Sequence, residues 1–400
     1  MYHKVLKFIN KIIDYLLIFF IKIYQKTLSP DKWILSFWLK WKICAHEPHC
    51  SQYAINHIKR YWWARSIIPI FDRVFGCVPS YIKKYHPTHY KVVFFSSAKI
   101  GIPFLKILMK DDRFDIIWLV TQPDQPSWRW LHMQPNIVKK RTNENYPDIE
   151  VNTPSGINPS KSKSWKQFIS WLEEKKPDYL VVISYGKIIP ESILNIAKIW
   201  PINVHWSLLP KYRWASPIQS VFLTEEDRTG ITIMLMDAWL DSWDIISQYI
   251  IPIDFNDTVE DTIHQFEKHW PKFLKNTLIS YGKGDVSPVS QNESIATTTN
   301  KIEKQDGKFD IFHTDIQTVY KRYRAYYLWP KIWFIYQDKR YIVEKLKLDK
   351  LLFEHNISLP IFTDNTIDAH HIHPAIKELI IKPEGRKSIT YIDWLHSLQS

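Results

Sequence analysis

Glycine is scarce in this chain. An average protein of 400 residues contains about 28 glycines, because glycine makes up about 7% of ordinary sequences. This chain has 9 glycines and 19 tryptophans. The shortfall in glycine is about as large as the number of tryptophans, so each tryptophan has to be judged by its position.

Cysteine is also scarce. The chain has Cys44, Cys50 and Cys77 and no others, and all three lie in the first 88 residues. Three cysteines cannot all pair with one another, which argues against a secreted disulfide framework and favours a reducing compartment.

Long uninterrupted apolar runs are missing too. The most apolar stretch, residues 5–26, is interrupted by Lys11, Asp14 and Lys22, and no small-residue cleavage site follows it. A transmembrane helix needs about 20 predominantly apolar residues, and a cleavable signal needs such a site. The charges recur near one helical face, which favours an interfacial helix; a true span and a buried helix stay open as alternatives.

The positive charge is concentrated at the N-terminus. Residues 1–88 contain 14 Lys and Arg against four acidic residues, while the whole chain carries a formal charge of +12. A basic, apolar segment suits an anionic membrane surface at least as well as a nucleic acid. We therefore expect a small helical segment over residues 1–88. The remainder is expected to be cytoplasmic, with attachment to the cytoplasmic face of the membrane through residues 1–26.

Residues 90–287 alternate short apolar runs with helical stretches, which predicts an α/β fold with a parallel sheet. The expected helices cover residues 102–110 and 164–176. The expected strands are 91–95, 115–120, 179–183, 202–205 and 230–236.

The chain after residue 287 has a different pattern. Polar residues 288–304 are typical of a linker, and residues 305–400 predict a β-rich domain. Within that domain we expect a hairpin around Gln337 and Asp338, and a strand with a turn over residues 379–386.

A polar trio marks the most informative stretch. Asn203 and His205 lie two residues apart on a predicted strand, so they share a face, and Asp241 follows the next predicted strand. An amide, an imidazole and a carboxylate can together bind a carbonyl oxygen, move a proton and stabilise an oxyanion. No Ser or Cys nucleophile is adjacent, which favours direct transfer between two substrates. The alternative, that the pair only satisfies buried hydrogen bonds, stays open on spacing alone.

The residues around this trio resemble a known family. INVHWSLLPKYRWASPIQ (202–219) and TGITIMLMDAWLDSWD (229–244) resemble the formyltransferases that use 10-formyltetrahydrofolate, above all those acting on methionyl-tRNA. Further matching segments follow in the same order: FSSAKIGIP (95–103), VTQPD (120–124), SWRW (127–130), PDYLVV (177–182), SYGKIIP (184–190), QNESIAT (291–297) and AYYLWP (325–330).

The resemblance implies a Rossmann-like parallel-sheet catalytic domain followed by a C-terminal β-barrel of OB-like type that binds tRNA. It implies transfer of a formyl group from the folate to the methionine amine of initiator tRNA, without a metal. Asn203 holds the formyl oxygen, His205 assists its charge and relays the proton, and Asp241 orients His205 and a water. Related enzymes that formylate glycinamide ribonucleotide or a sugar amine are alternatives, as is an inactive formyltransferase domain.

The same resemblance implies two binding regions. The folate site takes residues from two loops: Ser184, Tyr185, Gly186, Ile188, Pro190, Ser207, Leu208, Leu209 and Pro210. The tRNA-binding loop supplies Arg129, His132, Lys139, Lys140 and Arg141, whose charge suits phosphate. A merely solvated charged surface is the alternative for that loop.

The first 88 residues resemble a second family. SPDKW (29–33), CSQYA (50–54), KRYW (59–62) and the Gly76-Cys77 pair are similar to the membrane protein insertion efficiency factor, a non-enzymatic helper of membrane insertion. Zinc binding by Cys44, His46, His49, Cys50 and Cys77 is an alternative explanation, and the isolated cluster His370, His371 and His373 is a weaker metal candidate.

Ten tryptophans stand where these two families commonly have glycine. Bulky residues are strong outliers at the positive φ angles that glycine adopts readily. We hypothesise that the source organism reads UGA as glycine and that UGA was translated as Trp when the sequence was derived. Trp329, Trp333 and Trp394 fit as genuine. The ten positions are Trp33, Trp62, Trp128, Trp130, Trp200, Trp206, Trp214, Trp239, Trp243 and Trp270.

Overall fold

The computed structural model describes residues 2–27, 54–55, 58, 67, 89–126, 133–154, 163–236, 241–363 and 366–399. Contacts divide the chain into two units, Met1–Tyr90 with Asn276–Ser287, and Lys91–Lys275 with Pro288–Ser400. Each unit is described separately below. The expected boundaries within the second unit stay predictions.

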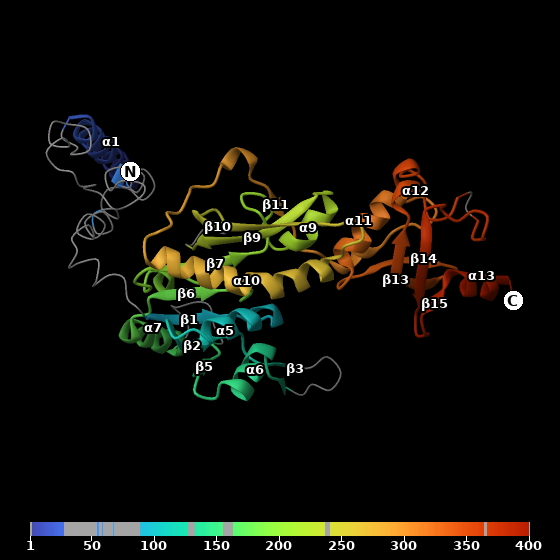
Figure 1. The fold of residues 1–400 in the computed structure, drawn as a ribbon, viewed down its shortest axis with the longest axis horizontal. Coiled ribbons are helices and arrows are strands. Elements are labelled where there is room, and N and C mark those ends of the chain that lie inside the picture. The colour runs from blue at the N-terminus through green and yellow to red at the C-terminus, as the bar shows by residue number, and fades with distance from the viewer. Residues whose placement is uncertain are drawn as a thin grey trace. The chain divides into compact units, whose positions relative to one another are not determined.

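The N-terminal unit contains the expected helix. Helix α1 (Tyr2–Thr27) covers the predicted stretch, and Figure 1 shows it at the start of the chain. Large apolar side chains such as Leu16 and Phe20 are exposed on it, as is Lys22. In the described part of the chain, no helix is both long and apolar enough to cross a membrane. The three cysteines lie outside the described residues.

The catalytic region is built on a seven-stranded sheet with the order β10-β9-β7-β6-β1-β2-β5. Apolar, largely β-branched runs such as YLVV in β6 are buried on both faces, as expected of central strands. The pairs β1–β6, β6–β7 and β2–β5 are parallel. The α/β fold class is therefore confirmed. The strands are β1 (Tyr90–Phe95), β2 (Phe114–Val120), β5 (Val151–Asn152), β6 (Tyr179–Val182), β7 (Trp200–His205), β9 (Arg228–Leu235) and β10 (Ile245–Pro252).

One strand runs against the expected direction. The stretch around residues 230–236 was expected to continue the parallel series, but β9 is antiparallel to β7, with His205 opposite Thr232. For β9 to run parallel to β7, the connection between them would have to carry the chain back to the end of the sheet at which β7 begins. Helix α9 (Pro217–Leu223) does not do this, because it packs mainly against α11 (Ile316–Tyr326) of the C-terminal domain. Strand β9 therefore begins at the end of the sheet at which β7 finishes.

Helices supply the rest of the catalytic core. Phe168 and Leu172 of α7 are buried with Val93 and Phe95 of β1, which alternate along that strand. Helix α10 places Phe266 against the Trp206 ring that follows β7. The helices are α5 (Ile102–Met109), α6 (Ile137–Asn145), α7 (Lys163–Lys175), α8 (Glu191–Leu194) and α10 (Val259–Gly282), with the short η1 (Lys99–Gly101). The two-residue strands are β3 (Gln125–Pro126), β4 (Met133–Gln134) and β8 (Arg213–Trp214).

The C-terminal domain is an antiparallel sheet of order β12-β13-β14-β15. The buried core around Trp394 also includes Phe222 and Val259 of the catalytic region. Gln337 and Asp338 have φ angles of 47° and 57°, the left-handed pair that a tight hairpin requires. This confirms the predicted hairpin, and the β-rich character is confirmed as well. The elements are β11 (Thr298–Thr299), β12 (Ile332–Tyr336), β13 (Lys339–Leu348), α12 (Lys350–His355), β14 (Ile376–Pro383), β15 (Ile389–Thr390) and α13 (Tyr391–Gln399), with η2 (Glu293–Ile295) and η3 (Lys304–Gly307).

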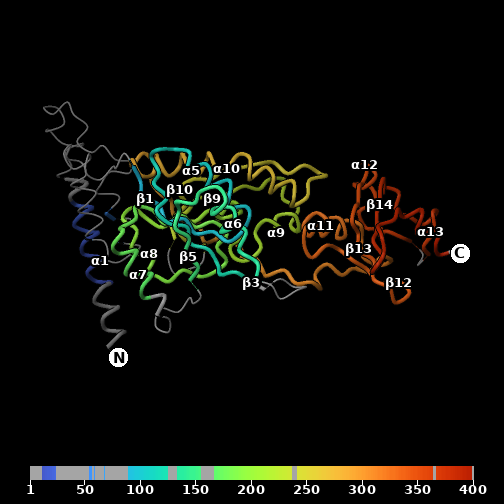
Figure 2. Tube along the Cα trace, turned by 90° about the horizontal axis from the view of Figure 1, so that it is seen from below, coloured from blue at the N-terminus to red at the C-terminus, as the bar shows by residue number. Residues whose placement is uncertain are grey.

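Helices α9 and α11 join the two parts of this unit, and Figure 2 shows them next to each other. Glu225 accepts from the Gln317 amide at 2.8 Å and pairs with Lys321 at 3.0 Å. Arg324 donates to the backbone carbonyls of Asp254 and Asp257. The catalytic region and the C-terminal domain therefore share an interface with polar contacts, and Phe222 and Val259 add apolar contacts to it.

Candidate active site

The polar trio lies where β7 ends. Asn203 pairs with Met234 of β9 on one side and Val182 of β6 on the other, so the strand is held firmly in the sheet. Within the described part of the chain, no residue hydrogen-bonds the Asn203 side chain. Its amide is therefore available to a ligand at the edge where ligands of α/β sheets usually bind.

Both ring nitrogens of His205 face oxygen atoms. Nε2 is 2.9 Å from the backbone oxygen of Tyr212, and Nδ1 is 3.5 Å from Oδ1 of Asp241. A carbonyl oxygen can only accept a hydrogen bond, so Nε2 carries a hydrogen. The ring is therefore oriented by two oxygen atoms, and His205 is only 5% exposed.

Asp241 is held in an unusual backbone conformation. Its φ is 54°, in the left-handed region that residues other than glycine rarely adopt. Burial alone would raise the pKa of its carboxyl. The neighbouring His205, the Trp214 N–H bond at 3.0 Å and the charge of Arg213 lower the pKa below its ordinary value. Asp241 is therefore kept as a carboxylate beside the imidazole.

The first predicted folate loop lies at the end of β6. Ser184 and Gly186 have positive φ angles of 46° and 75°, and the side chain of Gln122 donates to the Tyr185 carbonyl at 2.7 Å. A Cβ on Gly186 would lie 2.7 Å from that Gln122 amide nitrogen, so glycine is needed there. Burial raises the pKa of Tyr185 to about 12. Ile188 is exposed, and Pro190 is the N-cap of α8.

The second predicted folate loop, residues 207–210, is organised by Thr232 of β9. The Thr232 hydroxyl donates to the Ser207 carbonyl at 2.7 Å and accepts from the Leu209 N–H at 3.0 Å. Leu208 is half-buried, and the peptide bond between Leu209 and Pro210 is cis. Both loops follow neighbouring parallel strands, β6 and β7, so they lie at the same edge of the sheet.

Comparison with known proteins gives the relationship. Residues 90–278 match the formyl transferase family, and residues 301–399 match the formyl transferase C-terminal domain. A methionyl-tRNA formyltransferase from Caldicellulosiruptor saccharolyticus is 35% identical over 260 residues, which are 65% of this chain and 80% of that protein. The chain belongs to the methionyl-tRNA formyltransferase family.

A second curated relative supports this. A methionyl-tRNA formyltransferase from Campylobacter jejuni is 33% identical over 243 residues, 60% of this chain and 75% of that protein. Among solved structures, the sugar 3N-formyl transferase WlaRD, in the presence of dTDP and 5-N-formyl-THF, aligns with a TM-score of 0.47 and 17% identity, covering 76% of this chain and 97% of its own. Residues 13–89 match a putative membrane protein insertion efficiency factor.

The predicted tRNA loop is described only in part, because Arg129 and His132 lie outside the described residues. Lys139 is bound to Asp124 at 2.8 Å and Arg141 pairs with Glu144 at 3.4 Å, while Lys140 is exposed. The bond from Lys139 is the main cause that lowers the pKa of Asp124. Part of the basic charge in α6 is therefore neutralised within this region.

The candidate metal ligands are also described only in part. The cysteines and His46 and His49 lie outside the described residues. His371 is bound by Asp368 at 2.8 Å, whereas His373 is buried, with Nε2 2.9 Å from the Asn356 carbonyl oxygen and Nδ1 accepting from the Ala375 N–H. No cluster suited to a metal ion occurs among the residues that the structure describes.

The structure adds residues that the sequence prediction did not assign to the site. The Tyr212 carbonyl lies beside His205, and the Gln291 amide reaches the Asp241 loop from the linker. Both residues lie in segments that resemble the formyltransferases, and this resemblance was the sequence feature that could have identified them.

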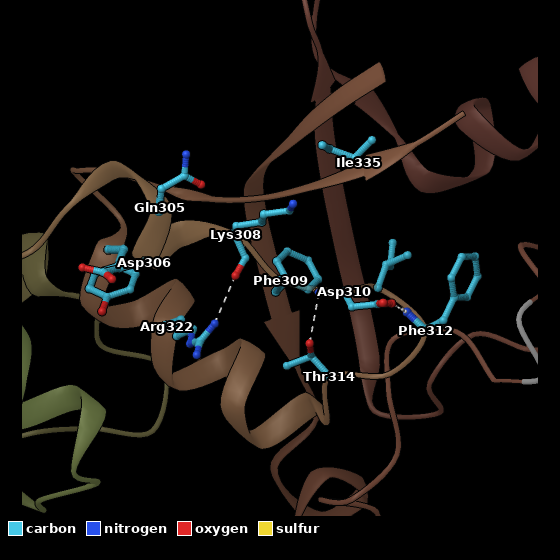
Figure 3. A pocket seen from close by; sticks show the side chains of 11 residues that line it. Gln305, Asp306, Lys308, Phe309, Asp310, Phe312, Thr314, Arg322 and Ile335 are labelled. Carbon is cyan, nitrogen blue, oxygen red and sulfur yellow. Dashed lines mark hydrogen bonds between the residues drawn. The ribbon is translucent and has the colours of Figure 1, made fainter. Parts of the chain in front are cut away.

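A separate cavity of about 830 Å³ in the C-terminal domain is lined by Lys308, Phe309 and Arg322 among others (Figure 3), and contains none of the trio.

Proposed function

We propose that this chain transfers the formyl group of 10-formyltetrahydrofolate to the α-amine of methionine on initiator tRNA. The observation that supports this best is the trio at the end of β7, with a free Asn203 amide beside a His205 ring that is oriented by Asp241. Membership of the family supports the same reaction.

The proposed step is a direct transfer. The amine nitrogen bonds to the formyl carbon, the bond from that carbon to N10 of the folate breaks, and one proton passes from the amine to N10. Asn203 donates to the oxygen as negative charge develops on it, and the nearby His205 ring assists that charge. His205 relays the proton once Nε2 leaves the Tyr212 carbonyl, to which it is bonded in this structure, and Asp241 keeps the ring in place and orients a water.

The folate is proposed to bind between the two loops that follow β6 and β7. Ser184, Tyr185, Gly186, Ile188 and Pro190 contribute from the first loop. The exposed Ile188 side chain offers an apolar contact, and the left-handed turn at Ser184 and Gly186 presents backbone groups to a ligand. The second loop contributes Ser207, Leu208, Leu209 and Pro210.

The tRNA is proposed to bind along the basic loop and the C-terminal domain. Exposed Lys140 and Arg141 suit phosphate contacts, and Arg129, His132 and Lys139 belong to the same proposal. The proposed division is a catalytic domain over 90–287, a linker over 288–304 and a tRNA-binding domain over 305–400. The neighbouring matches at 90–278 and 301–399 support it.

The N-terminal segment, residues 1–88, is proposed to hold the enzyme at the cytoplasmic face of the membrane and to aid membrane protein insertion. Its match to the insertion factor family supports this, as do the exposed Leu16, Phe19 and Phe20 of α1. A flotation assay with phosphatidylserine vesicles tests it, with deletion of residues 1–26 as the comparison. Binding that survives the deletion would contradict the proposal.

We also propose that several tryptophans are glycines in the native protein. Trp214 has a φ of 86° and is 55% exposed, and a bulky residue at such an angle is a strong outlier. Trp270 is fully buried, its ring centroid is 3.2 Å from that of Phe266, and its Nε1 has no partner among the described residues. Unpaired buried donors and overfilled cores are both costly.

Two measurements separate these proposals. Native peptide masses that contain Trp at positions 214, 239 and 243 would exclude recoding, as would UGG codons there. A formylation assay on charged initiator tRNA then compares the chain as written with its glycine-restored form. We expect activity in the restored form and little in the Trp form, since Trp239 and Trp243 flank Asp241. Inactivity of both forms would refute the proposed reaction.

A further inference from the structure

A short stretch of the linker, residues 291–299, is hydrogen-bonded to both loops that surround His205. On the first side, the Tyr212 N–H donates to the Thr297 hydroxyl at 2.9 Å, and the Thr297 N–H donates to the Pro210 carbonyl at 3.2 Å. These bonds fix the loop whose Tyr212 carbonyl accepts from His205. The parallel pairing of β11 with β8 extends the same attachment.

On the second side, the side chain of Gln291 is hydrogen-bonded to the turn that contains Asp241. Nε2 of Gln291 donates to the backbone carbonyls of Asp241 at 2.9 Å and Trp243 at 2.6 Å. Its Oε1 accepts from Nη2 of Arg213 at 2.8 Å. Arg213 is buried, and its guanidinium also makes a forked bond to Glu293 at 2.8 Å and 2.9 Å.

We propose that Gln291 is a positioning residue for formyl transfer, which acts by holding the Asp241 turn so that the carboxylate faces His205. This proposal rests on the proposed function. Asp241 has a left-handed φ of 54°, a conformation that L-residues leave readily unless neighbours hold them. The two bonds from Gln291 supply such a hold from outside the turn.

The position between the Asp241 turn and Arg213 requires a side-chain amide. The Asp241 and Trp243 carbonyls need a donor, whereas Arg213 needs an acceptor, and glutamine offers both on one side chain. Glutamate keeps the shape and the bond to Arg213 but turns an acceptor toward the two carbonyls. Methionine keeps the approximate volume and removes both functions.

The test compares Gln291→Met and Gln291→Glu with Asn292→Ala in the full-length chain. The ten questioned tryptophan positions carry whichever residue, Trp or Gly, the native peptide masses show. Asn292 is the matched control because it is the adjacent residue and caps η2 by accepting from the Ser294 N–H at 3.1 Å. Steady-state formylation of charged initiator tRNA is measured for each.

We expect kcat to fall about 10- to 100-fold in both Gln291 variants, since small misplacement of a catalytic group has effects of this size. The KM values for tRNA and folate should stay within about twofold, because the Gln291 amide is already bound to the Asp241 turn and to Arg213. The control should keep its kcat. A kcat change below about twofold in the Gln291 variants, a matching rise in KM, or an equal loss in the control would overturn the proposal.

A second readout does not depend on activity. In ¹⁵N spectra of the folded protein, the Nδ1 resonance of His205 should move in Gln291→Met and stay in place in Asn292→Ala. An unmoved resonance overturns the positioning role. If the unsubstituted chain transfers no formyl group, the proposed function fails, and this resonance alone then decides the role of Gln291.

Discussion

Replacing Arg324 by alanine is expected to loosen the C-terminal domain from the catalytic region while leaving both folded. Arg324 lies on α11, and its side chain crosses to the catalytic region. Nε donates to the Asp257 carbonyl at 2.6 Å and Nη2 to the Asp254 carbonyl at 2.7 Å. The guanidinium carbon is 4.9 Å from the ring centroid of Phe222.

The expected loss follows from these contacts. A part-buried hydrogen bond from a charged group contributes about 1.5 to 3 kcal/mol, and the exposed bond to Asp254 about 0.5 to 1.5 kcal/mol. The contact with Phe222 adds about 1 kcal/mol. Contacts made by one side chain are not additive, so we expect a total near 3 kcal/mol, or roughly a 100-fold change in the docking equilibrium.

Hydrogen exchange measures this change directly. Amides of α11 that are protected by docking should exchange on the order of 100-fold faster in Arg324→Ala, because the docked state opens more often. The matched control is Arg322→Ala on the same helix, since Arg322 donates to the Lys308 carbonyl within the C-terminal domain. Protection of α11 that stays within about threefold of the unsubstituted chain would refute the reasoning.

Four further substitutions test the site and the core. Asp241→Asn should lower kcat by about 10³- to 10⁴-fold, as for other carboxylates that orient a catalytic histidine, and single-turnover formylation with less than a tenfold loss would contradict this role. Because the pKa of Asp241 lies below its ordinary 3.8, its stabilising contribution should be complete above about pH 4 and decline only below that; urea unfolding that shows this decline near pH 6 would disagree. Burial lowers the pKa of His373 below 6.5, so the unfolded chain binds more protons and the free energy of unfolding should fall as the pH drops below about 6.5. His373→Gln should remove that dependence, and equal slopes for both proteins would count against it. Trp214→Gly should change the free energy of unfolding by no more than about 1 kcal/mol, because relief of its positive φ offsets the lost contacts. Trp270→Gly in the Trp-containing chain should raise the free energy of unfolding, because it removes the overfilled contact with Phe266 and an unpaired buried donor; thermal unfolding that shows a loss of about 4 kcal/mol, as for an ordinary large-to-small core change, would refute this.

Much of the catalytic sheet follows from local sequence. Strands such as β6 and β7 are short apolar runs bounded by polar turns, and the two-residue spacing of Asn203 and His205 places both on one face. The hairpin at Gln337 and Asp338 was also predictable, since a two-residue polar break separates two β-rich runs. These features depend on neighbours in the chain.

The parts that were not predictable depend on distant contacts. The direction of β9 is set by where α9 packs, and α9 packs against a helix about 100 residues later in the chain. The bonds from Arg213 to Gln291 join residues 78 positions apart, and no local pattern indicates them. In the sequence, Arg324 is indistinguishable from any other charged residue on a helix, and only the structure shows its bonds to the backbone carbonyls of Asp254 and Asp257.

The hydrogen-bonded linker has a consequence for dividing this protein into modules. A cut or a fusion point between residues 288 and 299 would remove Gln291 and Thr297 from the loops they hold, although this stretch looks like a dispensable spacer in the sequence. A catalytic fragment should therefore end after Thr299, and chimeras that exchange the C-terminal domain should keep residues 291–299 with the catalytic half. In this family member, the connection between domains also holds the loops around His205, although most of its residues are exposed.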